Sequence, residues 1–135
     1  MQSKIAPRLA GALLGLALTT ATAHAADLTG KWASGPDSKY VFTFDRQGDQ
    51  FTGKITGSDG HAFKIVDGTI DGDAISFYVL HDADWDDEVK ANDGQPFRNT
   101  AKGTVSGDEM TFSGSRENKP DVRPYTATLH RLAAQ

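Results

Sequence analysis

Short segments in which hydrophobic and polar residues alternate follow one another along most of this chain, and each ends at a turn rich in glycine and aspartate. In Tyr40–Phe44 the aromatic residues occupy every second position, and the alternation returns in Phe51–Ile55 after the Gly48-Asp49 pair. A period of two indicates a β-strand with one buried face, and a tight turn joins antiparallel neighbours. We therefore predict that these two segments pair as a hairpin.

Six further segments carry the same strand signal, and residues after 25 show no sustained helical period. Short connections favour a meander, because a tight hairpin can join only antiparallel neighbours. We expect an all-β fold, an eight-stranded antiparallel up-and-down barrel. Its other predicted strands are Leu28–Ala33, Phe63–Ile70, Ala74–His81, Phe97–Val105, Glu109–Ser115 and Tyr125–Arg131.

The first 25 residues have the organisation of a secretory signal peptide. Lys4 and Arg8 supply a positive start, an apolar stretch follows, and Ala23-His24-Ala25 forms a small-residue cleavage site. We expect residues 1–25 to be removed and residues 26–135 to form a single β-barrel domain that is periplasmic or secreted. The apolar stretch is shorter than the about 20 residues that span a bilayer, so we expect no membrane anchor.

Charge and cysteine content after the predicted cleavage exclude several partners. Loss of Lys4 and Arg8 leaves 12 basic residues against 18 acidic ones, a formal charge of −6. Nucleic acid is an unsuitable partner for such a surface, because phosphate binding depends on lysine and arginine. The chain has no cysteine, so a hydrophobic core without disulfides must hold the domain.

The first and last predicted strands each carry a residue of a short motif. Gly30-Lys31-Trp32 opens the first strand and Arg131 ends the last. A Gly-x-Trp with a basic residue that can stack on its indole resembles the calycin superfamily of lipocalins, fatty-acid-binding proteins and avidins. The resemblance implies a barrel in which Gly30, Trp32 and Arg131 are structural and the indole and guanidinium seal one end. A cation over an indole face contributes about 0.5 to 2 kcal/mol.

The opening Thr29–Trp32 and the ending Thr126–Arg131 also resemble small exported bacterial barrel proteins. Two features of the larger family are missing: a Thr-Asp-Tyr type motif between the sixth and seventh strands, and the loop tryptophans of an avidin pocket. No ligand therefore carries over from the resemblance.

An eight-stranded barrel is just wide enough either to be filled by side chains or to hold one small ligand, and both alternatives are open here. Concave binding sites are mostly apolar with a few polar groups. The favoured function is an exported binding protein that holds a small apolar or amphipathic ligand under the loop of residues 82–96. The predicted ligand-binding residues are Tyr40, Phe42, Phe77, Trp85 and Tyr125.

The 82–96 loop is acidic and exceeds ordinary hairpin lengths. Asp82, Asp84 and Asp86 alternate as at the start of a calcium loop, but Asp87 replaces the turn glycine and Asp93 the usual final glutamate. A solvated acidic lid is favoured over a Ca²⁺ site, and no cofactor is expected.

Trp85 in the same loop has three interpretations. It closes over the barrel mouth as a lid, stacks against a ligand, or anchors the loop on the barrel wall. Anchoring is the default interpretation.

Catalysis is the first alternative function. His81 ends a strand just before Asp82, and with Asp82 or Asp84 it is a candidate for acid–base chemistry at the barrel mouth. An isolated surface histidine is the favoured interpretation of His81. There is no nucleophile elbow for a catalytic serine, so we favour binding over catalysis. The second alternative is a protein-interaction module, such as a protease inhibitor, whose loops insert into a partner.

Overall fold

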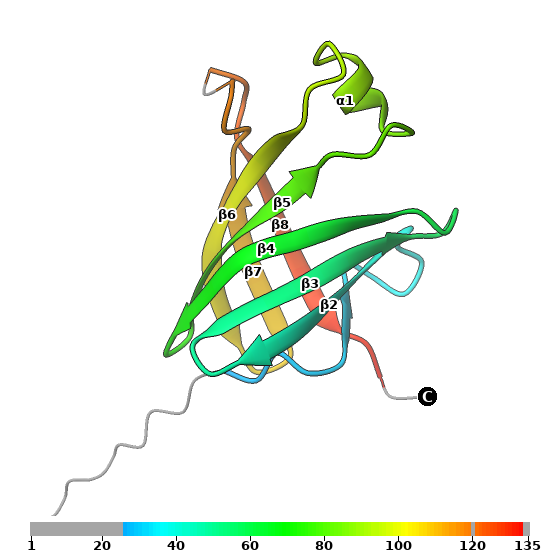
Figure 1. Ribbon diagram of the computed structural model, residues 1–135. Coiled ribbons are helices and arrows are strands. Elements are labelled where there is room, and N and C mark those ends of the chain that lie inside the picture. Colours follow the sequence, from blue (N-terminus) through cyan, green and yellow to red (C-terminus); the bar gives the residue numbers. More distant parts are fainter. Residues whose placement is uncertain (1–25, 120, 134–135) are drawn as a thin grey trace, which may run out of the picture.

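The computed structural model describes residues 26–119 and 121–133, so the predicted signal peptide lies outside the described residues. Eight antiparallel strands close into one barrel in sequence order, as Figure 1 shows. The meander barrel expected from the alternating pattern is confirmed. The strands are β1 (Lys31–Ala33), β2 (Tyr40–Gln47), β3 (Gln50–Gly57), β4 (Ala62–Asp71), β5 (Ala74–His81), β6 (Phe97–Ser106), β7 (Glu109–Gly114) and β8 (Tyr125–Arg131).

Apart from shifts of a few residues at other strand ends, two features differ from the expectation. β1 begins at Lys31 rather than Leu28, because Gly30 has a φ of 88°, which ends the extended backbone. The 82–96 loop contains one helical turn, α1 (Asp87–Lys90), which is too short to show a helical period in the sequence. Among the described residues, no helix is long and apolar enough to cross a membrane.

Aromatic rings pack against one another in the middle of the barrel. The ring centroid of Phe77 lies 5.3 Å from that of Phe112, 5.9 Å from that of Phe51 and 6.1 Å from that of Phe44. Phe42 extends this cluster, with 6.0 Å between its centroid and that of Phe112. These tilted and edge-on pairs each contribute about 0.5 to 1.5 kcal/mol beyond the area that they bury. The alternation along each strand therefore places one face inside a shared core.

One end of the barrel, here called the sealed end, is closed by Trp32. Its side chain is fully buried, and its indole Nε1 donates to the carbonyl of Leu28 at 3.2 Å. The guanidinium carbon of Arg131 lies 4.3 Å from the centre of the indole, and the same guanidinium donates to Asp108 at 2.9 Å. A Cβ on Gly30 would lie 3.5 Å from Arg131, so the chain passes closely beneath this side chain.

The wall of the barrel is irregular where β3, β4 and β5 meet. The register of β3 against β4 shifts between Phe51 and Gly53, and that of β4 against β5 shifts between Val66 and Thr69. A Cβ on Gly68 would lie 2.5 Å from the Phe51 ring, so only glycine allows this ring to pack there. The result is a bulge that bends the wall.

Candidate functional site at the far rim

The end of the barrel opposite the sealed end, here called the far rim, carries α1 and the rest of the 82–96 loop (Figure 1). The side chains that gather there come from the ends of β4, β5 and β6, from the loop and from the β7–β8 connection. Most of them are aromatic or titratable.

His81 is the central residue of this group. Its side chain is buried, and Nδ1 lies 2.7 Å from Asp86 Oδ2 while Nε2 lies 3.2 Å from Asn99 Nδ2. Because a carboxylate only accepts, Nδ1 donates its proton to Asp86, and Nε2 faces the side-chain amide of Asn99. Both ring nitrogens are therefore engaged. The expectation of an isolated surface histidine is wrong, since the inward parity of β5 carries His81 into the barrel.

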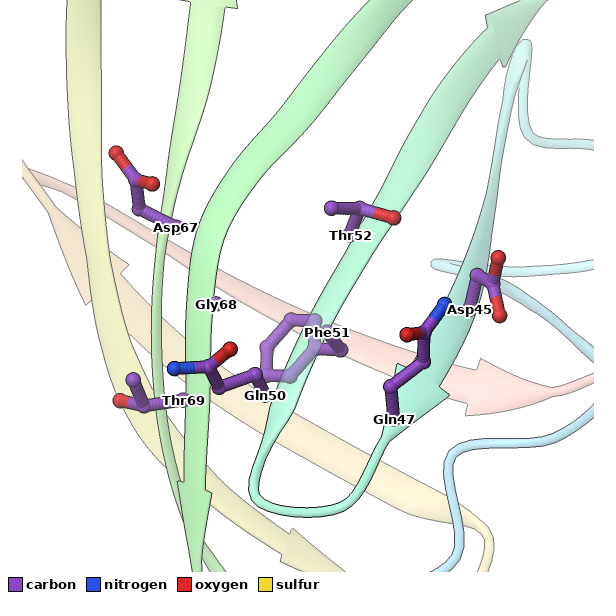
Figure 2. A pocket seen from close by; sticks show the side chains of 8 residues that line it. All are labelled: Asp45, Gln47, Gln50, Phe51, Thr52, Asp67, Gly68 and Thr69. Carbon is purple, nitrogen blue, oxygen red and sulfur yellow. The ribbon is translucent and has the colours of Figure 1, made fainter.

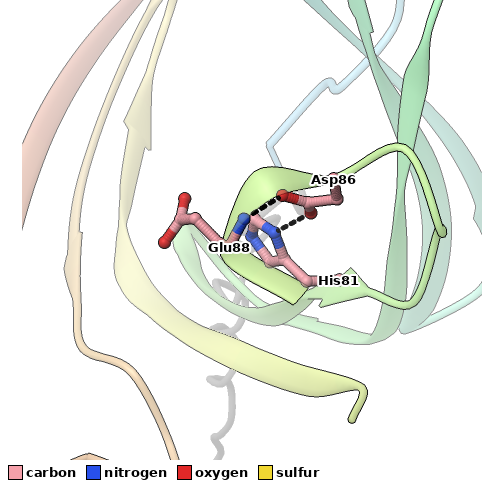
Figure 3. A group of neighbouring side chains, drawn as sticks. All are labelled: His81, Asp86 and Glu88. Carbon is pink, nitrogen blue, oxygen red and sulfur yellow. Dashed lines mark hydrogen bonds and ion pairs between the residues drawn. The ribbon is translucent and has the colours of Figure 1, made fainter. Parts of the chain in front are cut away.

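Asp86 joins the loop to the barrel. One carboxylate oxygen accepts from His81, and the other accepts from the backbone N–H of Glu88 at 2.9 Å, which caps the N-terminus of α1 (Figure 3). Only 5% of Asp86 is exposed, so both bonds are shielded from water. The loop is therefore held at a fixed position over the end of β5.

A stack of flat side chains surrounds the imidazole. The ring of Phe97 lies parallel to that of His81 at 4.6 Å, and Phe63 lies tilted at 4.8 Å. The guanidinium of Arg116 lies 3.6 Å from the centre of the Phe97 ring, and its Nη1 lies 4.0 Å from Glu88. Arg116 Nη2 is buried and has no hydrogen-bond partner within residues 26–119 and 121–133. A buried unpaired donor costs about 1 to 3 kcal/mol, so this atom favours an added acceptor.

Trp85 lies against the barrel wall. Its ring stacks on His61 at 4.1 Å, and it lies 5.3 Å from Phe63. This contact joins the 82–96 loop to the β3–β4 connection, a placement that agrees with the anchoring interpretation. In that connection the backbone N–H of His61 donates to Asp59, and this bond lowers the pKa of the Asp59 carboxyl.

The three alternating aspartates of the loop do not point to one site, because two of them are exposed and Asp86 is buried. Asp82 is exposed and lies 3.9 Å from Lys64, and Asp84 is exposed as well. A different set of residues in the described part of the chain could hold a metal ion. His81, Asp86 and Glu88 each offer one possible ligand atom, and these atoms lie within 4.8 Å of one another. A metal ion here would have to break the His81–Asp86 hydrogen bond and would lie beside a guanidinium. The Ca²⁺ hypothesis stays a prediction that this geometry does not favour.

The predicted ligand-binding residues lie at different heights in the barrel. Tyr40 is 49% exposed at the start of β2, and Phe77 is buried in the middle. Phe42 and Tyr125 are half-buried, and their ring centroids lie 6.0 and 6.4 Å from that of Phe112.

The hydroxyl of Tyr125 donates to the carbonyl of Thr100 at 2.8 Å, and burial raises its pKa. The structure thus brings Phe42, Phe77 and Tyr125 together through Phe112, while Tyr40 and Trp85 lie further out.

Several residues at the far rim were missed by sequence reasoning. Phe63, Phe97 and Asn99 occupy inward positions of β4 and β6, so extending the alternation to the strand ends finds them. Arg116 lies outside any periodic segment, and no sequence signal marks it.

Comparisons with protein-family models, with curated proteins and with solved structures each give no match. The calycin resemblance therefore stays a prediction that rests on Gly30, Trp32 and Arg131.

Proposed function

We propose that the protein binds a small amphipathic molecule inside the barrel, with entry at the far rim under the 82–96 loop. One observation carries this proposal. Phe42, Phe63 and Tyr125 pack against the core yet remain partly exposed, whereas Trp32 at the sealed end is fully buried. Apolar rings that pack on the core and that water can still reach favour an apolar ligand, because its binding removes that surface from water.

The polar end of the ligand has a natural partner in Arg116. Its buried Nη2 lacks an acceptor among the described residues, and the guanidinium is held by Phe97 on one side and by Asn118 through Nε. An acidic head group would supply the missing acceptor through a charge-assisted hydrogen bond. We therefore favour an apolar molecule that ends in an acidic group.

The His81–Asp86 pair supports binding rather than catalysis. A general base needs a free nitrogen within reach of substrate, but Asp86 and Asn99 occupy both nitrogens of His81. We assign the pair the task of positioning the loop. Export by the predicted signal peptide belongs to the same proposal, because a carrier of this kind would act in the periplasm or the medium.

The experiment uses 8-anilinonaphthalene-1-sulfonate, an apolar fluorescent anion, as the probe. The test variant is Ala127→Trp, which adds an indole on the inner face of β8 beside the core. The control is Thr128→Trp, which adds the same indole at the next, exposed position. We expect saturable binding at a stoichiometry of one to the parent and the control, and at least tenfold weaker binding to Ala127→Trp.

Melting curves first establish that both variants are folded. Absence of saturable binding to the folded parent would contradict the proposal. Equal affinity in the two tryptophan variants would place the probe outside the barrel and contradict it as well.

A further inference from the structure

The outer wall of the barrel holds a hollow that the proposed interior site does not use. It lies over β2, β3 and β4 and has a volume of about 410 Å³, within the usual range of small-molecule sites (Figure 2). Here this hollow is called the outer groove. Its polar lining consists of Asp45, Gln47, Gln50, Thr52, Asp67 and Thr69.

The backbone at the bulge shapes the groove. Asp67 has a φ of 53°, a left-handed conformation that a non-glycine residue seldom adopts. Gly68 follows and lies with Phe51 between the polar side chains, as Figure 2 shows. A side chain on Gly68 would collide with the Phe51 ring at 2.5 Å. The groove therefore has a polar lining on three neighbouring strands, with Gly68 and the edge of the buried Phe51 ring at its base.

The charge of the groove is partly compensated. Asp67 lies 3.2 Å from Arg98, which also lies 2.9 Å from Glu117. Hydrogen bonding to Glu117 raises the pKa of Arg98, so the guanidinium stays charged. Among the described residues, no lysine or arginine lines the groove itself. The groove thus offers acceptors without the concentrated negative charge that a bare cation needs.

The lining groups match the chemistry of sugar hydroxyls. Each hydroxyl of a saccharide both donates and accepts, and the lining combines carboxylate acceptors with amides and hydroxyls that do both. A metal ion or polyamine would use only the acceptors and would leave the amide N–H groups of Gln47 and Gln50 without a partner in the groove.

We propose that the outer groove is a second binding site, and that it takes a neutral saccharide unit. The site is independent of the interior ligand, because the outward side chains of β2, β3 and β4 form it while the inward ones form the core. Two exposed glutamines on either side of the Gly48-Asp49 turn supply the amides, so the site sits beside a tight hairpin that fixes its geometry.

Backbone amide NMR tests this proposal with defined probes. Methyl β-glucoside, methyl α-mannoside, cellobiose and chitobiose are titrated to 50 mM, and Ca²⁺ and spermidine are titrated separately. We expect at least one saccharide to give saturable shifts that centre on Gln50, Thr52 and Thr69. The cations are expected to give weaker, non-saturating shifts.

Substitutions in and near the outer groove test whether the saccharide binds there. Thr52→Trp fills the groove and is expected to weaken saccharide binding at least tenfold, whereas Thr56→Trp, on the same outer face of β3, should leave it within twofold. Gln50→Ala gives a second test that adds no bulk, with an expected loss of at least fivefold. Ala127→Trp should leave the saccharide shifts unchanged, which separates this site from the interior one.

Three results would overturn the proposal. These are the absence of saturable shifts with every saccharide, equal saccharide affinity in the Thr52 and Thr56 variants, and saturable shifts with Ca²⁺ or spermidine alone.

Discussion

Replacement of Asp86 by alanine should release the 82–96 loop from the barrel. The change removes the cap of α1, which costs about 0.5 to 2 kcal/mol in comparable helices. It also leaves the Nδ1–H of buried His81 without an acceptor, which costs about 1 to 3 kcal/mol. Because the two bonds use different oxygens of one carboxylate, their losses add in this variant. We expect a decrease of about 2 to 4 kcal/mol in the free energy of unfolding.

Two further variants test the origin of this loss of stability, one at Asp86 itself and one as a control at the neighbouring aspartate. Asp86→Asn keeps one side-chain oxygen, so it can retain either the cap or the bond to His81, and we expect about half of the alanine cost. Asp87→Ala removes the neighbouring carboxylate, whose side chain is 97% exposed and lies 3.7 Å from Lys90. Exposed pairs of this kind contribute little, so the Asp87 variant should unfold like the parent.

Urea denaturation measures the global effect, and amide hydrogen exchange at Glu88 and Val89 measures local opening of the loop. If the loop opens without unfolding of the barrel, His81 becomes hydrated, and exchange at these amides accelerates more than the urea midpoint falls. Parent-like values in both measurements for Asp86→Ala would refute the anchoring role of the carboxylate.

Three other variants test separate parts of the fold. Trp32→Ala should lower the free energy of unfolding by about 3 to 5 kcal/mol, because it empties the sealed end; an unchanged urea midpoint would refute this. Burial raises the pKa of Tyr125, so the stabilisation from its neutral phenol is complete below the unfolded pKa and is lost as pH rises through the folded pKa. Tyr125→Phe should therefore flatten the fall in melting temperature above about pH 10, the ordinary pKa of tyrosine; a slope equal to that of the parent would contradict this. Trp85→Ala should cost about 0.5 to 1.5 kcal/mol through the lost His61 stack and should weaken probe binding, and parent-like affinity would exclude Trp85 from the site.

The barrel was predictable because its pattern is local. The β2–β3 hairpin needs only the alternation of two neighbouring segments and a glycine turn, and Gln47 pairs with Gln50 as that turn requires. The pairing of Trp32 with Arg131 is different, because the two residues meet only when the barrel closes. Family resemblance, and not periodicity, indicated that contact.

The far rim was less predictable, because its strand residues meet partners in connections that no period describes. His81 continues the inward parity of β5, yet its partner Asp86 lies in a loop whose acidic composition indicates solvent. Arg116 reaches Phe97 from the β7–β8 connection, a contact that only the closed barrel brings about. The outer groove depends on a non-glycine residue, Asp67, in a left-handed conformation, which the sequence does not mark.

Native mass spectrometry of the protein purified from its own host under mild conditions tests the central claim most directly. The account predicts a complex with one small acidic, apolar molecule, which organic extraction removes and which Ala127→Trp fails to retain while Thr128→Trp retains it. Detection of the parent protein only at the mass of the bare polypeptide, both before and after incubation with the fluorescent anion, would contradict the account.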